Sequence, residues 1–250
     1  WKLSRIINGE HFCPQITALV EGCVERVIAE SGKIKDRDPE ALGAVMDGLV
    51  LSGAAISLYG NSRPASGAEH HMSHFWETIY DQRGQQHAMH GEQVATGTVL
   101  VLMLIEELLR CTPDFDRAKE AALAYDPRVW ERQIRRVYGA AAQEILDLEA
   151  RAGKNRTEGR LHRIESMSEH WTEIVEQFSS LPSAENMRLV LSKVNCPCTP
   201  GELGIDDATL KDTFLYAKEV RPRYTVFQTV WDLDLMDELS DKVINRLHQI

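Results

Sequence analysis

Apolar residues recur along this chain with the period of an α-helix. The first clear i, i+3, i+4, i+7 stripe lies between residues 13 and 32 and consists of Ile16, Leu19, Val20, Cys23, Val24, Val27 and Ile28. A second helix is predicted over residues 38–59, because Asp38 suits the N-cap, Pro39 suits the first helical position and Gly60 ends the pattern. Its middle is rich in Gly, Ala and Ser, so we expect other backbones to approach it closely in the centre of the fold.

A third helix, over residues 91–110, is apolar almost all round, which predicts burial. Convincing period-2 strands are absent from the sequence, so the pattern predicts an all-α fold. The most polar stretch, residues 150–163, indicates either a mobile connection or a solvated helix face. Further helices are predicted near residues 115–124, 127–137, 140–151, 158–179, 184–194, 206–219 and 236–249.

Composition narrows the function. The 250 residues include 28 basic and 38 acidic side chains, and the net charge of −10 argues against nucleic acid as a partner. The longest apolar run, residues 94–105, is too short to span a membrane, and the N-terminal residues lack the apolar core of a signal peptide. Five cysteines without regular spacing suit a reducing compartment. We therefore expect a cytoplasmic protein without a membrane span.

Candidate chemistry is concentrated in the histidines. Five of the nine, His70, His71, His74, His87 and His90, fall within 21 residues. In a helix, His70 and His74 are one turn apart and project from the same face. His90 begins the next long helix, and the adjacent Gly91 permits a close backbone approach. This spacing favours a metal or proton-transfer site whose third ligand comes from elsewhere. His71 and His87 are expected to be surface histidines beside it.

Two longer motifs carry a family resemblance. The segments "GNSRPASGAEHHMSH" and "HGEQVATGT", with "WKLS", "ELGI" and "RPRYT", resemble the sn-glycerol-1-phosphate dehydrogenases. This family belongs to the metal-dependent polyol and alcohol dehydrogenases related to dehydroquinate synthase. The similarity spans most of the chain and implies a two-domain fold, with a nucleotide-binding α/β domain followed by a helical domain. Residues 1–250 then form the helical metal- and substrate-binding domain alone.

The resemblance also implies roles for the histidines. His70 and His90 match the metal-binding histidines, and His74 matches a histidine that contacts the substrate and takes part in catalysis. The metal is divalent, with Zn, Ni and Fe equally compatible. An aspartate ligand and the groups that bind NAD(P) would precede Trp1, in the N-terminal domain. We therefore expect this chain by itself to bind metal weakly and to be inactive.

The implied reaction interconverts dihydroxyacetone phosphate and glycerol 1-phosphate. Arg63, Arg221 and Arg223 are candidates for binding the substrate phosphate, since guanidinium suits a pair of phosphate oxygens. The alternative for each is a surface or helix-cap role. Two other functions remain open, a cyclase similar to dehydroquinate synthase and a non-enzymatic helical interaction module. The sequence also leaves open which metal binds, whether NADH or NADPH is used, and whether the protein forms a homodimer.

Overall fold

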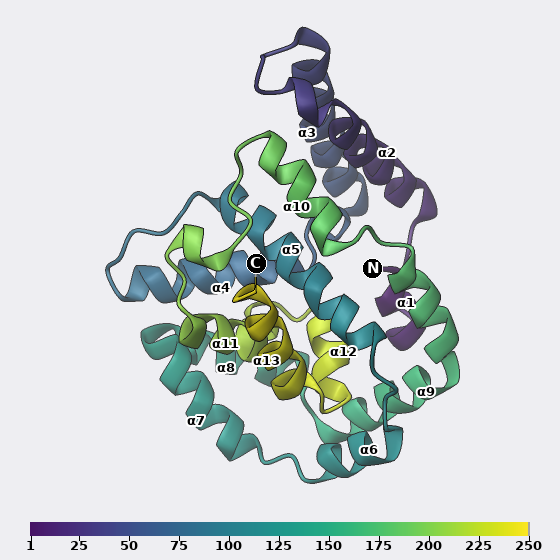
Figure 1. Cartoon of the computed structure of the whole chain (residues 1–250). Coiled ribbons are helices and arrows are strands. Elements are labelled where there is room, and N and C mark those ends of the chain that lie inside the picture. Colours follow the sequence, from purple (N-terminus) through teal and green to yellow (C-terminus); the bar gives the residue numbers. More distant parts are fainter. Residues whose placement is uncertain (250) are drawn as a thin grey trace.

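The computed structural model describes residues 1–249, and within them it contains helices and no strand. This confirms the all-α prediction. The pattern did not reveal α1 and α12, because seven residues make only about two turns. The α-helices, coloured in chain order in Figure 1, are α1 (Lys2–Asn8), α2 (Pro14–Glu30), α3 (Pro39–Tyr59), α4 (Ala68–Gln82), α5 (His90–Leu109), α6 (Phe115–Leu123), α7 (Pro127–Tyr138), α8 (Ala142–Ala152), α9 (Thr157–Ser179), α10 (Ala184–Lys193), α11 (Asp207–Tyr216), α12 (Val226–Asp232) and α13 (Met236–Leu247).

The helix α5 runs through the middle of the molecule (Figure 1). Every residue from 99 to 105 is buried, which confirms the predicted burial of this segment. Helices α4, α10 and α13 pack against it. Because apolar side chains surround the axis of α5, the helix has no face suited to water and other helices must enclose it.

Helices α2 and α3 pack on each other and project from the body as a hairpin (Figure 1). A Cβ atom on Gly48 would lie 3.5 Å from Cγ2 of Val27 in α2. A small residue of α3 therefore does permit close packing, but its partner is α2 and not a helix of the core. Neither helix contributes a residue to the main hydrophobic core. The prediction that this glycine- and alanine-rich helix is central is therefore wrong within residues 1–249.

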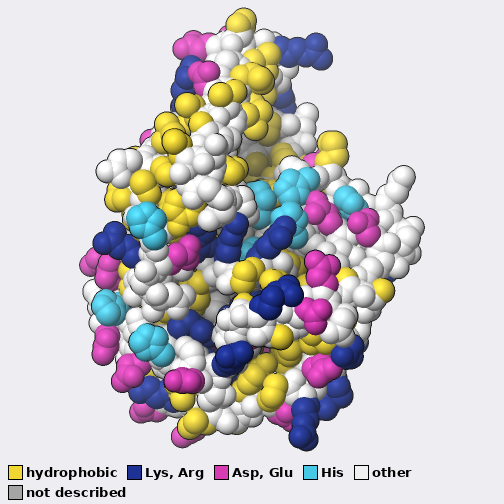
Figure 2. Space-filling model, turned by 180° about the vertical axis from the view of Figure 1, so that it is seen from behind, with side chains coloured by type: hydrophobic (Ala, Val, Ile, Leu, Met, Phe, Trp, Pro, Cys, Tyr) yellow, Lys and Arg dark blue, Asp and Glu magenta, His cyan; other side chains and the backbone are white. Residues whose placement is uncertain are grey.

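The outer surface of α3 is apolar and exposed, and Figure 2 shows apolar side chains gathered over the hairpin. The helix α3 has 21 residues, and its most apolar 18 residues have a mean hydropathy of 1.7, so it is long and apolar enough to cross a membrane, unlike the run at residues 94–105. One such helix is weak evidence for a span. The large apolar side chains of α3 with 37% to 74% of their area exposed are Leu42, Met46, Leu49, Val50, Leu51 and Leu58.

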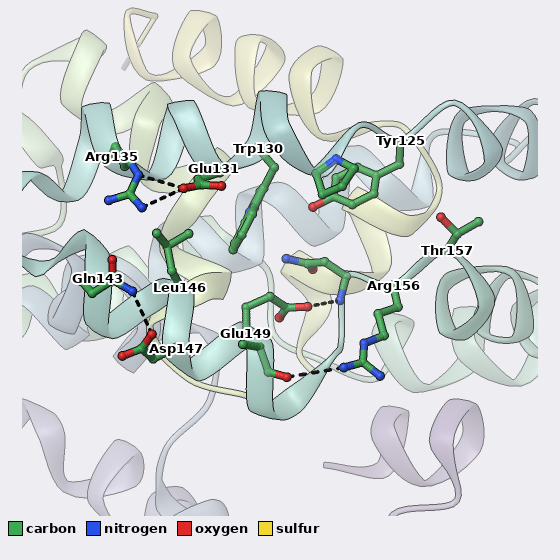
Figure 3. A pocket seen from close by; sticks show the side chains of 13 residues that line it. Tyr125, Trp130, Glu131, Arg135, Gln143, Leu146, Asp147, Glu149, Arg156 and Thr157 are labelled. Carbon is green, nitrogen blue, oxygen red and sulfur yellow. Dashed lines mark hydrogen bonds and ion pairs between the residues drawn. The ribbon is translucent and has the colours of Figure 1, made fainter.

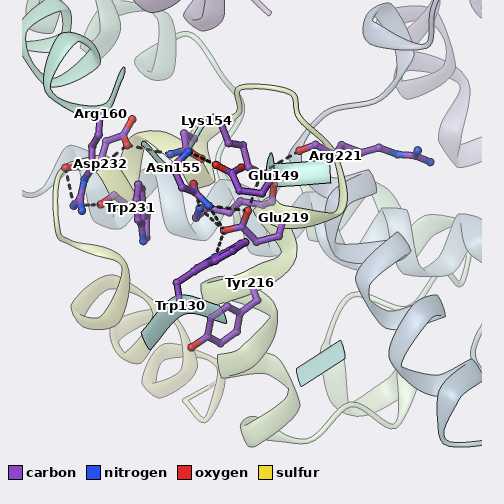
Figure 4. Close-up of polar contacts among 12 residues, drawn as sticks. Trp130, Glu149, Lys154, Asn155, Arg160, Tyr216, Glu219, Arg221, Trp231 and Asp232 are labelled. Carbon is purple, nitrogen blue, oxygen red and sulfur yellow. Dashed lines mark hydrogen bonds and ion pairs between the residues drawn. The ribbon is translucent and has the colours of Figure 1, made fainter. Parts of the chain in front are cut away.

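A network of buried charges joins the polar stretch at residues 150–163 to the segment after α11 (Figure 4). Glu219 accepts hydrogen bonds from Lys218 Nζ at 2.5 Å and from Asn155 Nδ2 at 3.0 Å, and Lys154 Nζ lies 3.0 Å from its other oxygen. Trp130 Nε1 donates to the same carboxylate. Part of this stretch is the solvated face that was expected, since Arg151, Arg156, Glu158 and His162 are exposed. Lys154, Arg160 and Arg163 instead pair with carboxylates in the interior.

The pKa values of this network reflect the pairing. Burial alone would raise the pKa of Glu219, but Lys154 and Lys218 outweigh burial and lower it to about 2. Burial lowers the pKa of Lys218 to about 8 in spite of the attraction of Glu219. Removing one member of such a network leaves the opposite charge buried without a partner.

We expect Glu219→Gln to lower the free energy of unfolding by about 3–5 kcal/mol at pH 7, because buried Lys218 and largely buried Lys154 lose their counter-ion. The folded-state pKa of about 2 lies below the ordinary value of 4.5, so this stabilisation is present above pH 4.5 and is lost as the pH falls toward 2. Urea unfolding of wild type and Glu219→Gln at pH 7, 4.5 and 3 measures the difference in their free energies of unfolding. This difference should become smaller as the pH falls.

The matched control is Glu185→Gln, which removes a surface ion pair with Arg188 and should change stability by less than about 1 kcal/mol. A difference between wild type and Glu219→Gln that stays constant from pH 7 to pH 3 would contradict the role given to Glu219.

Candidate functional site

Three histidine rings meet where α4 lies against the start of α5. His70 and His74 project from α4, and His90 is the first residue of α5. The ring centroids lie 6.3 Å apart for His70 and His74, 5.4 Å for His70 and His90, and 5.5 Å for His74 and His90. The predicted meeting of the two helices at these side chains is therefore present. Figure 2 shows histidines in a hollow below the hairpin, beside Lys and Arg side chains.

Gly97 allows the two helices to approach this closely. A Cβ atom at Gly97 would lie 3.0 Å from the backbone oxygen of Glu69, the residue that precedes His70. Gly91 is in open space, with no heavy atom within 4 Å of the position of its Cβ. The prediction that Gly91 permits the approach is therefore wrong, and Gly97 does so two turns later.

Two carboxylates hold the three rings by their Nδ1 atoms. Glu69 Oε1 lies 2.8 Å from Nδ1 of His70. Glu77 reaches two rings, with Oε2 at 3.0 Å from Nδ1 of His74 and Oε1 at 2.8 Å from Nδ1 of His90. A carboxylate on Nδ1 leaves Nε2 available for a metal ion or a substrate, as in carboxylate–histidine–metal sites.

The histidines also affect the carboxylates. Burial acts to raise the pKa of Glu77, but hydrogen bonds from His90 and His74 lower it overall. The same balance lowers the pKa of Glu69, where His70 and the backbone N–H of Gly67 supply the hydrogen bonds. Both carboxylates are therefore ionised at neutral pH.

Sequence reasoning overlooked both carboxylates. The signal for Glu77 was its position three residues after His74, which places the two on one helix face. Three possible ligand atoms, one from each of His74, Glu77 and His90, lie within 4.8 Å of one another. These residues form a ligand set that is an alternative to His70 and His90. The roles expected for His70 and His90 as ligands and for His74 as a substrate contact remain predictions.

His71 differs from the expected surface histidine. Its side chain is 1% exposed, and neither ring nitrogen has a hydrogen-bond partner. Burial, followed by the positive charges of Lys154, Arg223 and Arg63, lowers its pKa well below 6.5. His71 is therefore neutral, and it lies near both His74 of the three-histidine cluster and a group of cations. His87, in contrast, is exposed as expected.

The three candidate arginines have different surroundings. Arg63 is buried, and its guanidinium contacts Glu10 and donates to the backbone oxygen of Tyr224. Arg223 is partly buried and donates to Ser62 Oγ at 2.9 Å, so further N–H groups of its guanidinium are available. Arg221 is exposed. Lys154 and Arg223 line one cavity, which makes Lys154 a cation that the sequence reasoning missed.

Another pocket lies between α7 and α8 (Figure 3). Trp130 and Tyr125 form part of its wall, and no histidine lines it. Its rim carboxylates are already engaged, Glu131 by Arg135 and Asp147 by Gln143. This pocket therefore lacks the donor set that the histidine cluster provides.

Comparison with known proteins identifies related enzymes, although no family model matches the chain. The chain is 25% identical to the glycerol-1-phosphate dehydrogenase [NAD(P)+] of Geobacillus thermodenitrificans over 238 residues, which is 95% of this chain and 50% of that protein. The Geobacillus stearothermophilus enzyme of the same name is 25% identical over 88% of this chain and 46% of its own length. Nearly the whole chain is similar to glycerol-1-phosphate dehydrogenases.

A shorter region gives higher identity. The glycerol-1-phosphate dehydrogenase [NAD(P)+] of Pyrococcus furiosus is 38% identical over 104 residues, which cover 42% of this chain and 29% of that enzyme. The two Geobacillus enzymes are matched along most of this chain, but the chain spans only about half of their length. It corresponds to a C-terminal part of them. The sequence resemblance to glycerol-1-phosphate dehydrogenases is thereby confirmed.

We expect Gly97→Ala to destabilise the protein by about 1–3 kcal/mol, because the new methyl group meets backbone rather than a flexible side chain. Gly91→Ala is the matched control in the same helix and should be neutral or stabilising by up to about 1 kcal/mol. Thermal and urea unfolding of both variants measures this. Equal stability of the two would contradict the close contact at Glu69.

Proposed function

We propose that this chain is the metal- and substrate-binding helical part of an NAD(P)-dependent glycerol-1-phosphate dehydrogenase, which interconverts dihydroxyacetone phosphate and glycerol 1-phosphate. The observation that carries the proposal is the meeting of His70, His74 and His90, each held at Nδ1 by a carboxylate. The similarity to enzymes of that name along 95% of the chain supports the choice of reaction. A cytoplasmic location is part of the proposal.

The donor set fits a divalent cation. Three imidazoles with Nε2 available and two ionised carboxylates behind them suit Zn, Ni or Fe. We assign His70 and His90 as ligands. When bound there, such an ion would polarise the oxygen of the reacting C–O group, and the hydride would come from or go to NAD(P). No residue of this chain is assigned to NAD(P), which we propose is bound by other residues of the full-length enzyme.

His74 is proposed to contact the reacting oxygen. Its Nδ1 is hydrogen-bonded to Glu77, so Nε2 faces the substrate and can orient that oxygen or exchange a proton with it. The ring lies between 5 and 7 Å from the rings of both proposed ligands, centroid to centroid. This is close enough for one substrate oxygen to meet all three side chains.

Arg223 is the best candidate for the substrate phosphate. Burial, followed by the nearby charges of Arg63 and Arg221, lowers the pKa of Arg223, which indicates an excess of positive charge that an anion would relieve. Arg63 is already occupied by Glu10 and Tyr224. Lys154 contributes charge but is partly neutralised by Glu219.

In the full-length enzyme, His90→Ala should remove the metal and abolish activity, because a ligand is lost. His74→Ala should retain the metal while turnover falls by roughly 10²–10⁴-fold, the usual contribution of a positioned acid–base group. Elemental analysis and steady-state kinetics of both variants separate the two roles. Loss of metal from His74→Ala would make His74 a ligand and refute the division.

Arg223→Ala should raise KM for dihydroxyacetone phosphate by roughly 10- to 150-fold, since a charge-assisted contact contributes about 1.5–3 kcal/mol. KM for unphosphorylated dihydroxyacetone should change little. Arg132→Ala, at an exposed position of α7, is the control and should alter neither constant. Equal effects of Arg223→Ala on both substrates would show that Arg223 does not bind the phosphate.

A further inference from the structure

We propose that Glu77 is a positioning residue that fixes the tautomers of His74 and His90 together, so that both rings present Nε2 to the centre of the site. The inference rests on the proposed function for the identity of that centre. Glu77 lies one turn after His74 on α4, and its carboxylate also crosses to the first residue of α5. Together with Ser73, it joins the two helices in one hydrogen-bonded unit.

The tautomer follows from donor and acceptor counting. An ionised carboxylate has no proton to donate, so each imidazole nitrogen bonded to it must carry one. Glu77 Oε2 meets Nδ1 of His74, and Oε1 meets Nδ1 of His90. In the neutral form of both rings, Nδ1 is then the protonated atom, and Nε2 carries the lone pair.

A second chain of hydrogen bonds is compatible with the same tautomer of His90. Gln93 Nε2 donates to the backbone oxygen of Ala88 at 2.7 Å, which leaves Gln93 Oε1 to accept from Ser73 Oγ at 3.0 Å. The only proton of the Ser73 hydroxyl is used in this arrangement. Its oxygen lies 3.0 Å from Nδ1 of His90 and can accept from it. The hydroxyl can also turn and donate to Nδ1 of His90, so this contact permits the Nδ1–H form without requiring it, and the carboxylate of Glu77 is what fixes it.

Glu69 provides a contrast within the same site. It contacts His70 alone among the rings and also accepts from the backbone N–H of Gly67. Substitution of Glu69 should therefore release one ring, whereas substitution of Glu77 should release two. Loss of negative charge alone would affect the rings equally in both variants. The number of rings released therefore distinguishes a positioning role of Glu77 from a general effect of charge.

The test measures tautomers in the 250-residue chain without metal. Long-range ¹⁵N–¹H correlation spectra at pH 8.5 distinguish a protonated Nδ1 from a protonated Nε2 in neutral imidazole. We expect the Nδ1–H form for His74 and His90 in the wild type. In Glu77→Ala both rings should change to the Nε2–H form.

Glu77→Gln makes a sharper prediction. Its amide has one acceptor oxygen and an NH₂ group that can only donate, so one ring should keep the Nδ1–H form and the other should switch. The control is Asp81→Asn, one turn further along α4, which removes the same charge from a carboxylate whose histidine contact is His87. It should leave His74 and His90 unchanged. The Nε2–H form in the wild type, or no change in Glu77→Ala, would overturn the proposal.

Metal affinity gives a readout that does not depend on activity. Competition between the chain and a chromophoric chelator for Zn²⁺ should show affinity reduced by roughly 10- to 100-fold in Glu77→Gln, as for other groups behind metal ligands. Asp81→Asn should stay within about threefold of the wild type. If the tautomers change and the affinity does not, the positioning role is refuted while the proposed metal site stands. If the wild type fails to bind Zn²⁺, the proposed site fails and the tautomer measurement still decides the role of Glu77.

Discussion

The close contact of α4 with α5 is the constraint on which the candidate site depends. Gly97 brings α5 against the backbone of Glu69, and this contact sets the distance over which Glu77 reaches His90. A wider separation would leave His90 without its carboxylate and the rings without a common centre. The packing of two largely buried helices therefore determines the geometry of polar groups at their ends.

The buried charge network reaches the neighbourhood of the histidine cluster through Lys154. Lys154 pairs with Glu219, donates to the backbone oxygens of Lys218 and Arg221, and lies close enough to His71 to affect its pKa. It thereby connects the C-terminal segment that carries Arg223 to α4. His71 is a neutral ring near both groups, since Lys154, Arg223 and His74 all act on its pKa.

The sequence predicted most of the helices, because periodic apolar positions and local caps are readable from neighbouring residues. Asp38, Ser183 and Asp206 each accept hydrogen bonds from the first turn of their helices in the structure. It also predicted that the histidines of residues 70–90 gather. Partners that cross between helices were not predictable, since spacing along one helix does not show that Glu77 reaches His90. The same limitation explains why the buried ion pairs of the polar stretch at residues 150–163 were not predicted. The counter-ions of Lys154 and Arg163 are Glu219 and Asp232, more than fifty residues away along the chain.

The α2–α3 hairpin has a practical consequence for work with this protein. Its apolar surface belongs to a part of the molecule that shares no residue with the main core, so the packing of that core does not depend on covering the hairpin. At high protein concentration the same surface favours adhesion between molecules. Sulfate and phosphate salts strengthen that tendency, because they favour burial of apolar area. The exposed apolar side chains of α3 would therefore limit the solubility of the chain, and polar substitutions at those positions would extend the range of concentrations open to spectroscopy.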